Sequence, residues 1–127
     1  MAAYAGSIRK LAKNNGDFRR EIVTNKHSQV VLMCLRPGED IGEETHADVD
    51  QVLILVEGEG AAVLDGGRRE VEKGSMVVVP AGTRHNLINT GDEPLHLYTI
   101  YAPPQHAPGT VHATRAEAMA AEAAHEA

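Results

Sequence analysis

Two neighbouring stretches decide how this chain folds: residues 38–60, GEDIGEETHADVDQVLILVEGEG, and residues 74–89, GSMVVVPAGTRHNLIN. Among their apolar runs stand four polar side chains at fixed spacing, Glu44, His46, Gln51 and His85. Two imidazoles, a carboxylate and an amide that converge in an apolar interior are most economically explained by a bound cation. The sequence therefore predicts a metal site before it predicts any reaction.

The chain around these stretches reads as short β-rich runs separated by turn residues. The runs cover residues 18–24, 28–35, 41–46, 51–56, 60–64, 68–71, 76–79, 84–88 and 95–101. Gly, Pro, Asn and Asp stand between them and supply the backbone angles that tight turns need. Because no helical segment separates these strands, they indicate an all-β antiparallel sandwich or barrel rather than βαβ units.

Strand geometry predicts how the four polar side chains meet. Side chains two apart on a strand share a face, with Cα atoms roughly 6 to 7 Å apart. Glu44 and His46 can therefore reach one ion about 2 Å from each. Residues 47–50 form a reversal that places Gln51 opposite this pair, and a Pro-Ala-Gly turn aims His85 at the same interior.

The spacing resembles the two sequence motifs of the cupin superfamily. The chain reads Gly38-x5-Glu44-x-His46-x4-Gln51-x6-Gly58 and then Gly74-x5-Pro80-x-Gly82-x2-His85-x3-Asn89. The resemblance extends over about residues 28–104 and implies a small single-domain jelly-roll β-barrel. It also implies that one divalent metal ion is bound by Glu44, His46, Gln51 and His85.

The first motif departs from the cupin pattern at two positions. Cupins usually present His-x-His and then Glu, whereas this chain has Glu44-x-His46 and then Gln51. An amide oxygen is a weaker donor than a carboxylate, so Gln51 either binds the ion or hydrogen-bonds a metal-bound water. Glu44, His46 and His85 remain as a two-His-one-carboxylate set, which suits Fe and does not exclude Mn, Ni, Zn or Cu.

His106 is the candidate catalytic acid or base. It lies in the Pro-rich segment 102–109 after the last strand, and a loop there can fold over the mouth of a barrel. The alternative is a solvent-exposed loop histidine. The other histidines have no further candidate catalytic or metal-ligating residues around them and are assigned structural or surface roles; they are His27, His96, His112 and His125.

Three further residues near the motifs have open or ordinary roles. Gln29 and Met33 share a strand face and either line the pocket or occupy plain core positions. Asn89 is interpreted as a turn residue, because Thr-Gly-Asp follows it.

The two ends of the chain are predicted to be helical. Ser7 can cap a short helix over residues 8–13, and Thr114 with Glu117 forms a capping box for a helix over residues 115–126. A chain of 127 residues is one domain by length. Residues 1–127 therefore read as a single cupin domain, with a core barrel over about 18–104 and a C-terminal loop and helix over 105–127.

Composition narrows the partners to small molecules. The net charge is −6, aromatic residues make up 3%, and basic residues do not cluster, so nucleic acid is excluded. No apolar run reaches the length of a membrane span, which excludes a membrane partner. A single cysteine, Cys34, and no recognisable secretion signal predict a cytoplasmic protein. Residues 52–56 and 76–79 are apolar on both strand faces, which predicts a homodimer.

Three functions from different classes fit these residues. The first is a metal-dependent enzyme of isomerase or epimerase type, acting on a sugar, a sugar phosphate or a keto acid. Small cupins that the chain resembles are often sugar-isomerase-like. The second is an Fe-dependent dioxygenase, which the two-His-one-carboxylate set favours. The third is a non-catalytic module that binds a small ligand or a metal.

Overall fold

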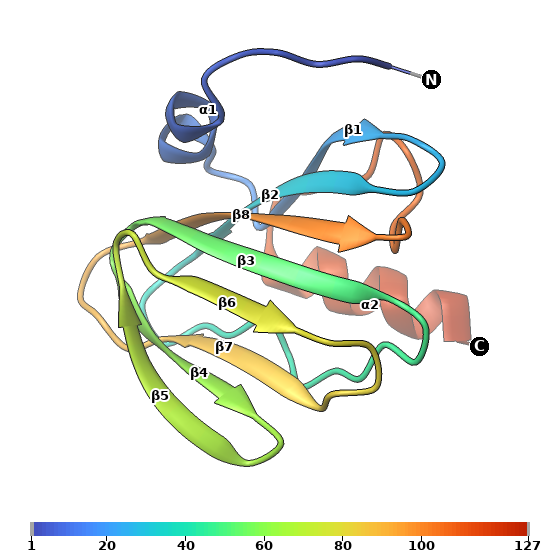
Figure 1. Cartoon of the computed structure of the whole chain (residues 1–127). Helices are drawn as coiled ribbons and strands as arrows, with labels where there is room; N and C mark the ends of the chain where they lie inside the picture. Colours follow the sequence, from blue (N-terminus) through green and yellow to red (C-terminus); the bar gives the residue numbers. More distant parts are fainter. Residues whose placement is uncertain (1, 127) are drawn as a thin grey trace.

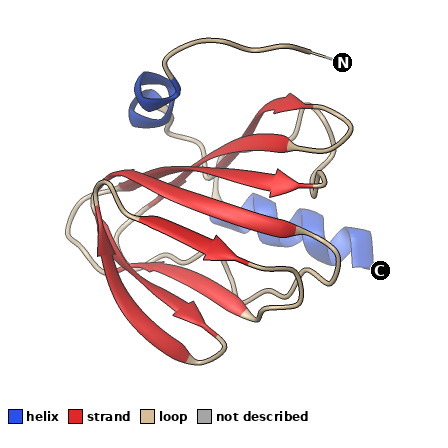
Figure 2. Ribbon diagram, in the orientation of Figure 1, coloured by secondary structure: helices blue, strands red, loops and turns tan. Residues whose placement is uncertain are grey.

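The computed structural model describes residues 2–126. It shows two β-sheets with a short helix near the N-terminus and a longer one at the C-terminus (Figures 1 and 2). In chain order the elements are α1 (Ile8–Asn14), β1 (Arg19–Thr24), β2 (Gln29–Leu35), β3 (Asp50–Glu57), β4 (Glu59–Leu64), β5 (Gly67–Glu72), β6 (Met76–Val79), β7 (His85–Asn89), β8 (Leu95–Ala102), β9 (Val111–His112) and α2 (Arg115–Glu126). The predicted all-β class with two terminal helices is confirmed.

The strands form a jelly roll of two antiparallel sheets. The larger sheet has the order β6-β3-β8-β2-β1-β9, and the smaller has the order β5-β4-β7. Strands distant in sequence lie side by side, since β8 is hydrogen-bonded to both β2 and β3. The main core lies between the sheets and includes Leu53, Leu87 and Leu97. This topology brings Glu44 of the first sequence motif beside His85 of the second.

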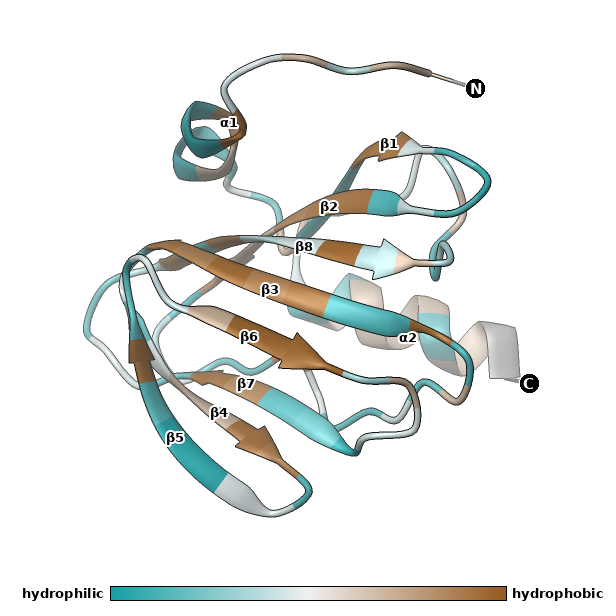
Figure 3. Ribbon diagram, in the orientation of Figure 1, coloured by the Kyte–Doolittle hydropathy of each residue, from teal (hydrophilic) through white to brown (hydrophobic). Residues whose placement is uncertain are grey.

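Alternating burial explains why these segments are strands. In β8, Leu95, Leu97, Thr99 and Tyr101 are buried and the residues between them are more exposed, because successive side chains point to opposite faces. Figure 3 shows β3 and β6 as largely hydrophobic and β5 as largely hydrophilic, in keeping with the exposure of β5 along most of its length. Alternation of this kind fixes which side chains face the site.

The N-terminal helix covers part of the outer face of the larger sheet. Ser7 caps α1, because its Oγ accepts a hydrogen bond from the Lys10 N–H. Ala12 of α1 packs with Leu32 and Val56 in a second, smaller apolar cluster. α1 therefore buries only part of the outer apolar surface that β3 and its neighbours present.

The C-terminal helix begins with the predicted capping box. The Glu117 N–H donates to Thr114 Oγ1, and Glu117 Oε2 accepts from the Ala113 N–H. Arg115 of α2 also donates to the backbone and side-chain oxygens of Asp40, which ties the helix to the loop that carries the first motif. Within residues 2–126, no helix has the length and apolarity required to cross a membrane.

The strand expected over residues 41–46 does not form, and that prediction was wrong. Gly42 has φ 89°, a left-handed conformation that interrupts an extended strand. The segment makes only isolated bridges to β7, from Asp40 to Ile88 and from Glu44 to His85. The short β9, which the sequence analysis did not predict, pairs with β1.

Candidate metal centre

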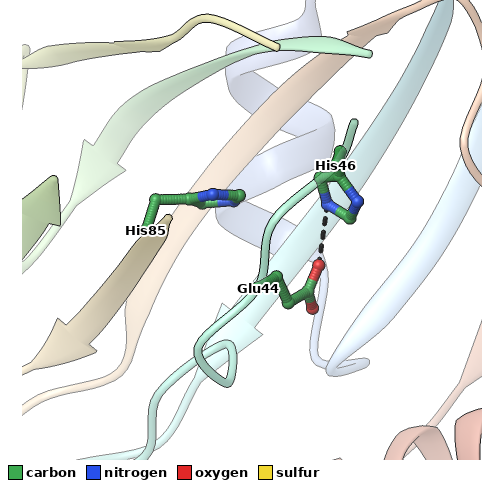
Figure 4. Close-up of side chains that lie close together, drawn as sticks. All are labelled: Glu44, His46 and His85. Carbon is green, nitrogen blue, oxygen red and sulfur yellow. Dashed lines mark ion pairs between the residues drawn. The ribbon is translucent and has the colours of Figure 1, made fainter. Parts of the chain in front are cut away.

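Glu44, His46 and His85 form the centre of the site. One ligand atom from each lies within 4.8 Å of those from the other two, and the three side chains approach one another from a loop and from β7 (Figure 4). The group mixes two imidazoles with one carboxylate, a donor set that binds divalent transition metals. Tertiary structure has thus brought together three of the four predicted ligands.

A pair of backbone hydrogen bonds holds the first motif against the second. The Glu44 N–H donates to the His85 carbonyl and the His85 N–H donates to the Glu44 carbonyl, each at 2.9 Å. The Gly82 N–H donates to the His46 carbonyl at 2.8 Å. The loop that carries Glu44 and His46 is therefore aligned on β7 without being a strand itself.

The contact between Glu44 and His46 fits a pair of metal ligands. Glu44 Oε2 lies 2.8 Å from His46 Nε2. His46 Nε2 is buried, yet it has no aligned hydrogen-bond partner among the described residues. Burial alone would raise the pKa of Glu44, but the contact with His46, together with nearby positive charge, lowers it below its ordinary value. A carboxylate thus stays ionised beside an imidazole nitrogen that makes no aligned hydrogen bond among the described residues, as a cation site requires.

His85 is held in the tautomer that a metal ligand needs. Its Nδ1 lies 3.0 Å from the Thr83 carbonyl oxygen, which can only accept, so Nδ1 carries the proton and Nε2 presents a lone pair. Gln51 Oε1 lies 3.0 Å from that Nε2, while Gln51 Nε2 donates to Thr99 Oγ1. The Nε2 lone pair of His85 therefore faces a lone pair of Gln51 Oε1, and a cation bound by both atoms would relieve the repulsion between them.

Gln51 does not lie where strand pairing was expected to place it. Its backbone pairs with Val79 of β6 and Tyr101 of β8, whereas Glu44 pairs with His85. The expected hairpin fails because residues 41–46 are a loop. Gln51 nevertheless reaches the site through the His85 contact, and it is 1% exposed. Its role as a direct ligand stays a prediction.

A cavity of about 640 Å³ opens beside the metal centre. Its lining includes Glu44, His46 and His106, together with Arg19 from β1 and Glu122 from α2. The Pro-rich loop thus contributes His106 to the wall of the same cavity as two of the candidate ligands. The predicted catalytic role of His106 stays a prediction.

Gln29 fixes the loop that carries His106. Its Oε1 accepts hydrogen bonds from the backbone N–H groups of Gln105 and His106, and its Nε2 donates to the His106 carbonyl at 2.6 Å. The side chain is fully buried. Gln29 is not among the residues that line the cavity, so of the two alternatives the structure supports the core position, from which Gln29 anchors the loop.

Burial sets the protonation of the two groups next to the centre. It lowers the pKa of His106 to about 4, so the imidazole is neutral near pH 7. Burial also raises the pKa of Tyr101 above its ordinary value, so its hydroxyl keeps its proton. His106 Nε2 and the Tyr101 hydroxyl are 3.4 Å apart. His106 in the cavity wall is thus a neutral imidazole, and the buried Tyr101 hydroxyl behind it is protonated.

Sequence reasoning missed two residues of the cavity wall. Arg19 was not singled out from the sequence, and His112 was assigned a structural role, yet both line the cavity. Neither belongs to a motif, and their side chains meet only because β9 pairs with β1. His27 is exposed and His96 half-buried, while the side chain of His125 lies outside the described part. Asn89 was interpreted as a turn residue but is the last residue of β7; its Oδ1 accepts from the Gly91 N–H in the turn that follows.

Comparison with known proteins identifies the family. Residues 31–101 match the family model described as the cupin domain. YrkC of Bacillus subtilis is 50% identical over 125 residues, covering 94% of this chain and 67% of that protein. Protein L612 of Acanthamoeba polyphaga mimivirus is 39% identical over 117 residues, covering 88% and 72%.

Solved structures agree with the fold. The crystal structure of BH2720 from Bacillus halodurans has a TM-score of 0.92 at 45% identity, covering 94% of this chain and 95% of that one. KdgF from Halomonas has a TM-score of 0.65 at 21% identity, covering 71% and 81%, and this second likeness concerns the fold alone. The resemblance and the fold expected from the two sequence motifs are confirmed.

The ligand assignment predicts an order of metal loss. Metal content should fall to near zero in His46→Ala and His85→Ala, fall substantially in Glu44→Ala, and change least in Gln51→Ala, because a neutral amide is the weakest donor. Gln51→Glu should bind at least as tightly as the parent, since it adds a negative charge at the ion. Elemental analysis of protein purified without chelator or a nickel column measures each value. Equal metal content in the parent and both histidine variants would contradict the assignment.

The burial of His106 predicts a stability change with pH. The pKa of His106 is about 4 in the fold and about 6.5 when exposed, so the unfolded chain binds the proton more readily. The resulting stability is fully present above about pH 6.5 and is lost as the pH falls towards 4. Calorimetry of chelator-treated protein should show a smaller loss of Tm between pH 7 and 4.5 in His106→Gln than in the parent. The exposed-residue control His27→Gln should follow the parent, and equal losses in all three would refute the assignment.

Proposed function

The chain belongs to the cupin family, and on that premise we propose that it is a metal-dependent enzyme acting on a small oxygen-rich substrate, with isomerase- or epimerase-like chemistry. A sugar, a sugar phosphate or a keto acid fits this description. The observation that carries the proposal is the convergence of Glu44, His46 and His85 next to a cavity of about 640 Å³. A cavity of this size admits a small molecule together with its reacting atoms.

The residues of the chain divide the work between binding and proton transfer. Glu44, His46 and His85 would hold the ion, with the Gln51 amide beside them. A divalent cation bound there supplies Lewis-acid polarisation of a carbonyl oxygen. His106, neutral because burial lowers its pKa, accepts a proton from the carbon next to that carbonyl. The Tyr101 hydroxyl oxygen, 3.4 Å from His106 Nε2, accepts from Nε2–H and holds the imidazole in place. His106 Nδ1 is then the atom that takes the substrate proton and returns it to carbon to complete the isomerisation.

Two other functions each have one observation in their favour. The two-His-one-carboxylate donor set favours an Fe-dependent dioxygenase, because this triad recurs in non-heme Fe(II) oxygenases. The low pKa of His106, about 4, favours a non-catalytic binding module, because a general base works best with a pKa near the operating pH. Proton transfer is favoured over both because it also gives a role to a neutral His106 in the wall of the cavity that Glu44 and His46 line.

Proton exchange tests the proposed function directly. Metal-loaded protein is incubated in deuterium oxide with panels of aldoses, ketoses, sugar phosphates and 2-oxo acids, and NMR follows exchange or isomerisation next to the carbonyl. The enzyme should turn over at least one class, and His106→Asn should lower that rate by about 100-fold or more with unchanged metal content. Oxygen uptake without exchange would indicate the dioxygenase. Ligand-induced stabilisation without either would indicate the binding module.

The edge of the larger sheet also leads us to propose a homodimer. Met76 and Val78 on β6 are 65% and 50% exposed, and β6 is an edge strand. They lie beside Val52 and Ile54 of β3, which are only half-buried. An edge strand with large apolar side chains is a ready template for a second copy.

Sedimentation tests the dimer. The parent should sediment at micromolar concentration as a species of about twice 13.6 kDa, because pairing buries the exposed β6 face. Val78→Lys should shift it to the monomer, whereas Val111→Lys, at another exposed valine, should not. A parent that sediments only as a 13.6 kDa species would rule the dimer out.

A further inference from the structure

We propose that Arg19 is the anion-binding residue of the cavity and that the substrate is a small carboxylate, a 2-oxo or 2-hydroxy acid. This inference rests on the proposed function and names its substrate class. In the arrangement we infer, the carboxylate group of the substrate pairs with the Arg19 guanidinium. The neighbouring oxygen of the substrate then faces the group formed by Glu44, His46 and His85.

The first observation is that Arg19 is buried but poorly satisfied. Its side chain is 2% exposed, and Nε is buried with no hydrogen-bond partner among the described residues. Its polar contacts run through Nη1 and are long, 3.4 Å to His112 Nδ1 and 3.5 Å to Glu122 Oε1. A buried guanidinium is normally held by short charge-assisted hydrogen bonds. The unused Nε–H is therefore available to a ligand.

The second observation is the position of Arg19. It lines the same cavity as Glu44, His46 and His106, and its charge is one of the causes that lower the pKa of Glu44 and of His106. The guanidinium also lies 5.4 Å from the centre of the Phe18 ring, a contact that orients its plane. A ligand in this cavity can thus touch the cation and the metal group at once.

The charges around Arg19 favour a carboxylate over a phosphate ester. Nε and a terminal nitrogen present two parallel N–H groups, which match the two oxygens of a carboxylate. Glu43, Glu44 and Glu122 also line the cavity, so a dianionic phosphate meets more repulsion than a monoanion. Glu43 is 3.7 Å from Arg84 and largely exposed, which leaves Glu122 as the direct competitor for Arg19.

Glu122 therefore acts as a stand-in for the substrate carboxylate. It belongs to α2, its side chain is 40% exposed, and its oxygen is 3.5 Å from Arg19 Nη1. Because the contact is long and Glu122 is partly exposed, a ligand carboxylate can compete with Glu122 for the Arg19 guanidinium. Removing the Glu122 charge should strengthen carboxylate binding, which a purely structural Arg19 would not produce.

Binding of pyruvate tests the inference without any turnover. Isothermal titration or NMR titration measures Kd for pyruvate with zinc-loaded and with chelator-treated protein. Kd should weaken by about 10- to 100-fold in Arg19→Lys and Arg19→Met, the loss expected for charge-assisted hydrogen bonds. It should tighten severalfold in Glu122→Gln. Arg20→Gln is the matched control, because the neighbouring arginine is half-exposed and pairs with Asp17; its Kd should equal that of the parent.

Two further ligands test the inference on the parent protein, in case an Arg19 variant fails to fold. Pyruvamide, which lacks the charge, should bind the parent as weakly as pyruvate binds Arg19→Met, and inorganic phosphate should bind less tightly than pyruvate. The inference would be overturned if folded Arg19 variants bound pyruvate as tightly as the parent, or if Glu122→Gln bound it no more tightly. It would also be overturned if the parent bound phosphate more tightly than pyruvate, or did not bind pyruvate at all. If zinc does not bind, the proposed function fails, while the Arg19 dependence in chelator-treated protein still decides this inference.

Discussion

The site depends on the pair of backbone hydrogen bonds between Glu44 and His85. This single bridge joins a loop, which has no strand partner of its own nearby, to the start of β7. It places a carboxylate from the first motif next to an imidazole from the second, although the two residues are 41 positions apart in the chain. The bridge between Asp40 and Ile88 aligns the same loop further along β7, but the Glu44–His85 bridge is the one that sets the two ligand positions side by side.

The polar groups around this bridge fall into two sets: one orients the side chains of the site, and the other holds the loop that carries His106. Thr83 sets the tautomer of His85 and leaves its Nε2 lone pair directed at the centre. Thr99 accepts from the Gln51 amide nitrogen and so directs the amide oxygen at the centre. Gln29, fully buried on β2, holds the loop of His106 in place. A buried amide that satisfies three backbone groups is costly to replace, because any apolar substitute would leave those groups without partners. The position of His106 thus follows from the strand rather than from the Pro-rich loop itself.

Departure from the usual cupin ligand set changes the chemistry more than the fold. A glutamate in place of a histidine and a glutamine in place of a glutamate keep one formal negative charge at the centre, so a divalent ion is still matched electrostatically. The amide makes Gln51 the weakest donor and leaves a two-His-one-carboxylate core. Arg19 places a buried positive charge in the same cavity, and its contact with the Glu122 carboxylate is long, at 3.5 Å.

The sequence by itself determined the jelly-roll class, both terminal helices and the residues of the candidate metal group, because turn chemistry, strand alternation and motif spacing are local signals. Tertiary structure alone decided that residues 41–46 form a loop, where a left-handed Gly42 overrides the β-like pattern. It also decided that Arg19 and His112, 93 positions apart, share a cavity wall. The sequence near either residue does not predict that contact. It arises from the pairing of β9 with β1 and the packing of α2, which are long-range contacts that no local pattern encodes.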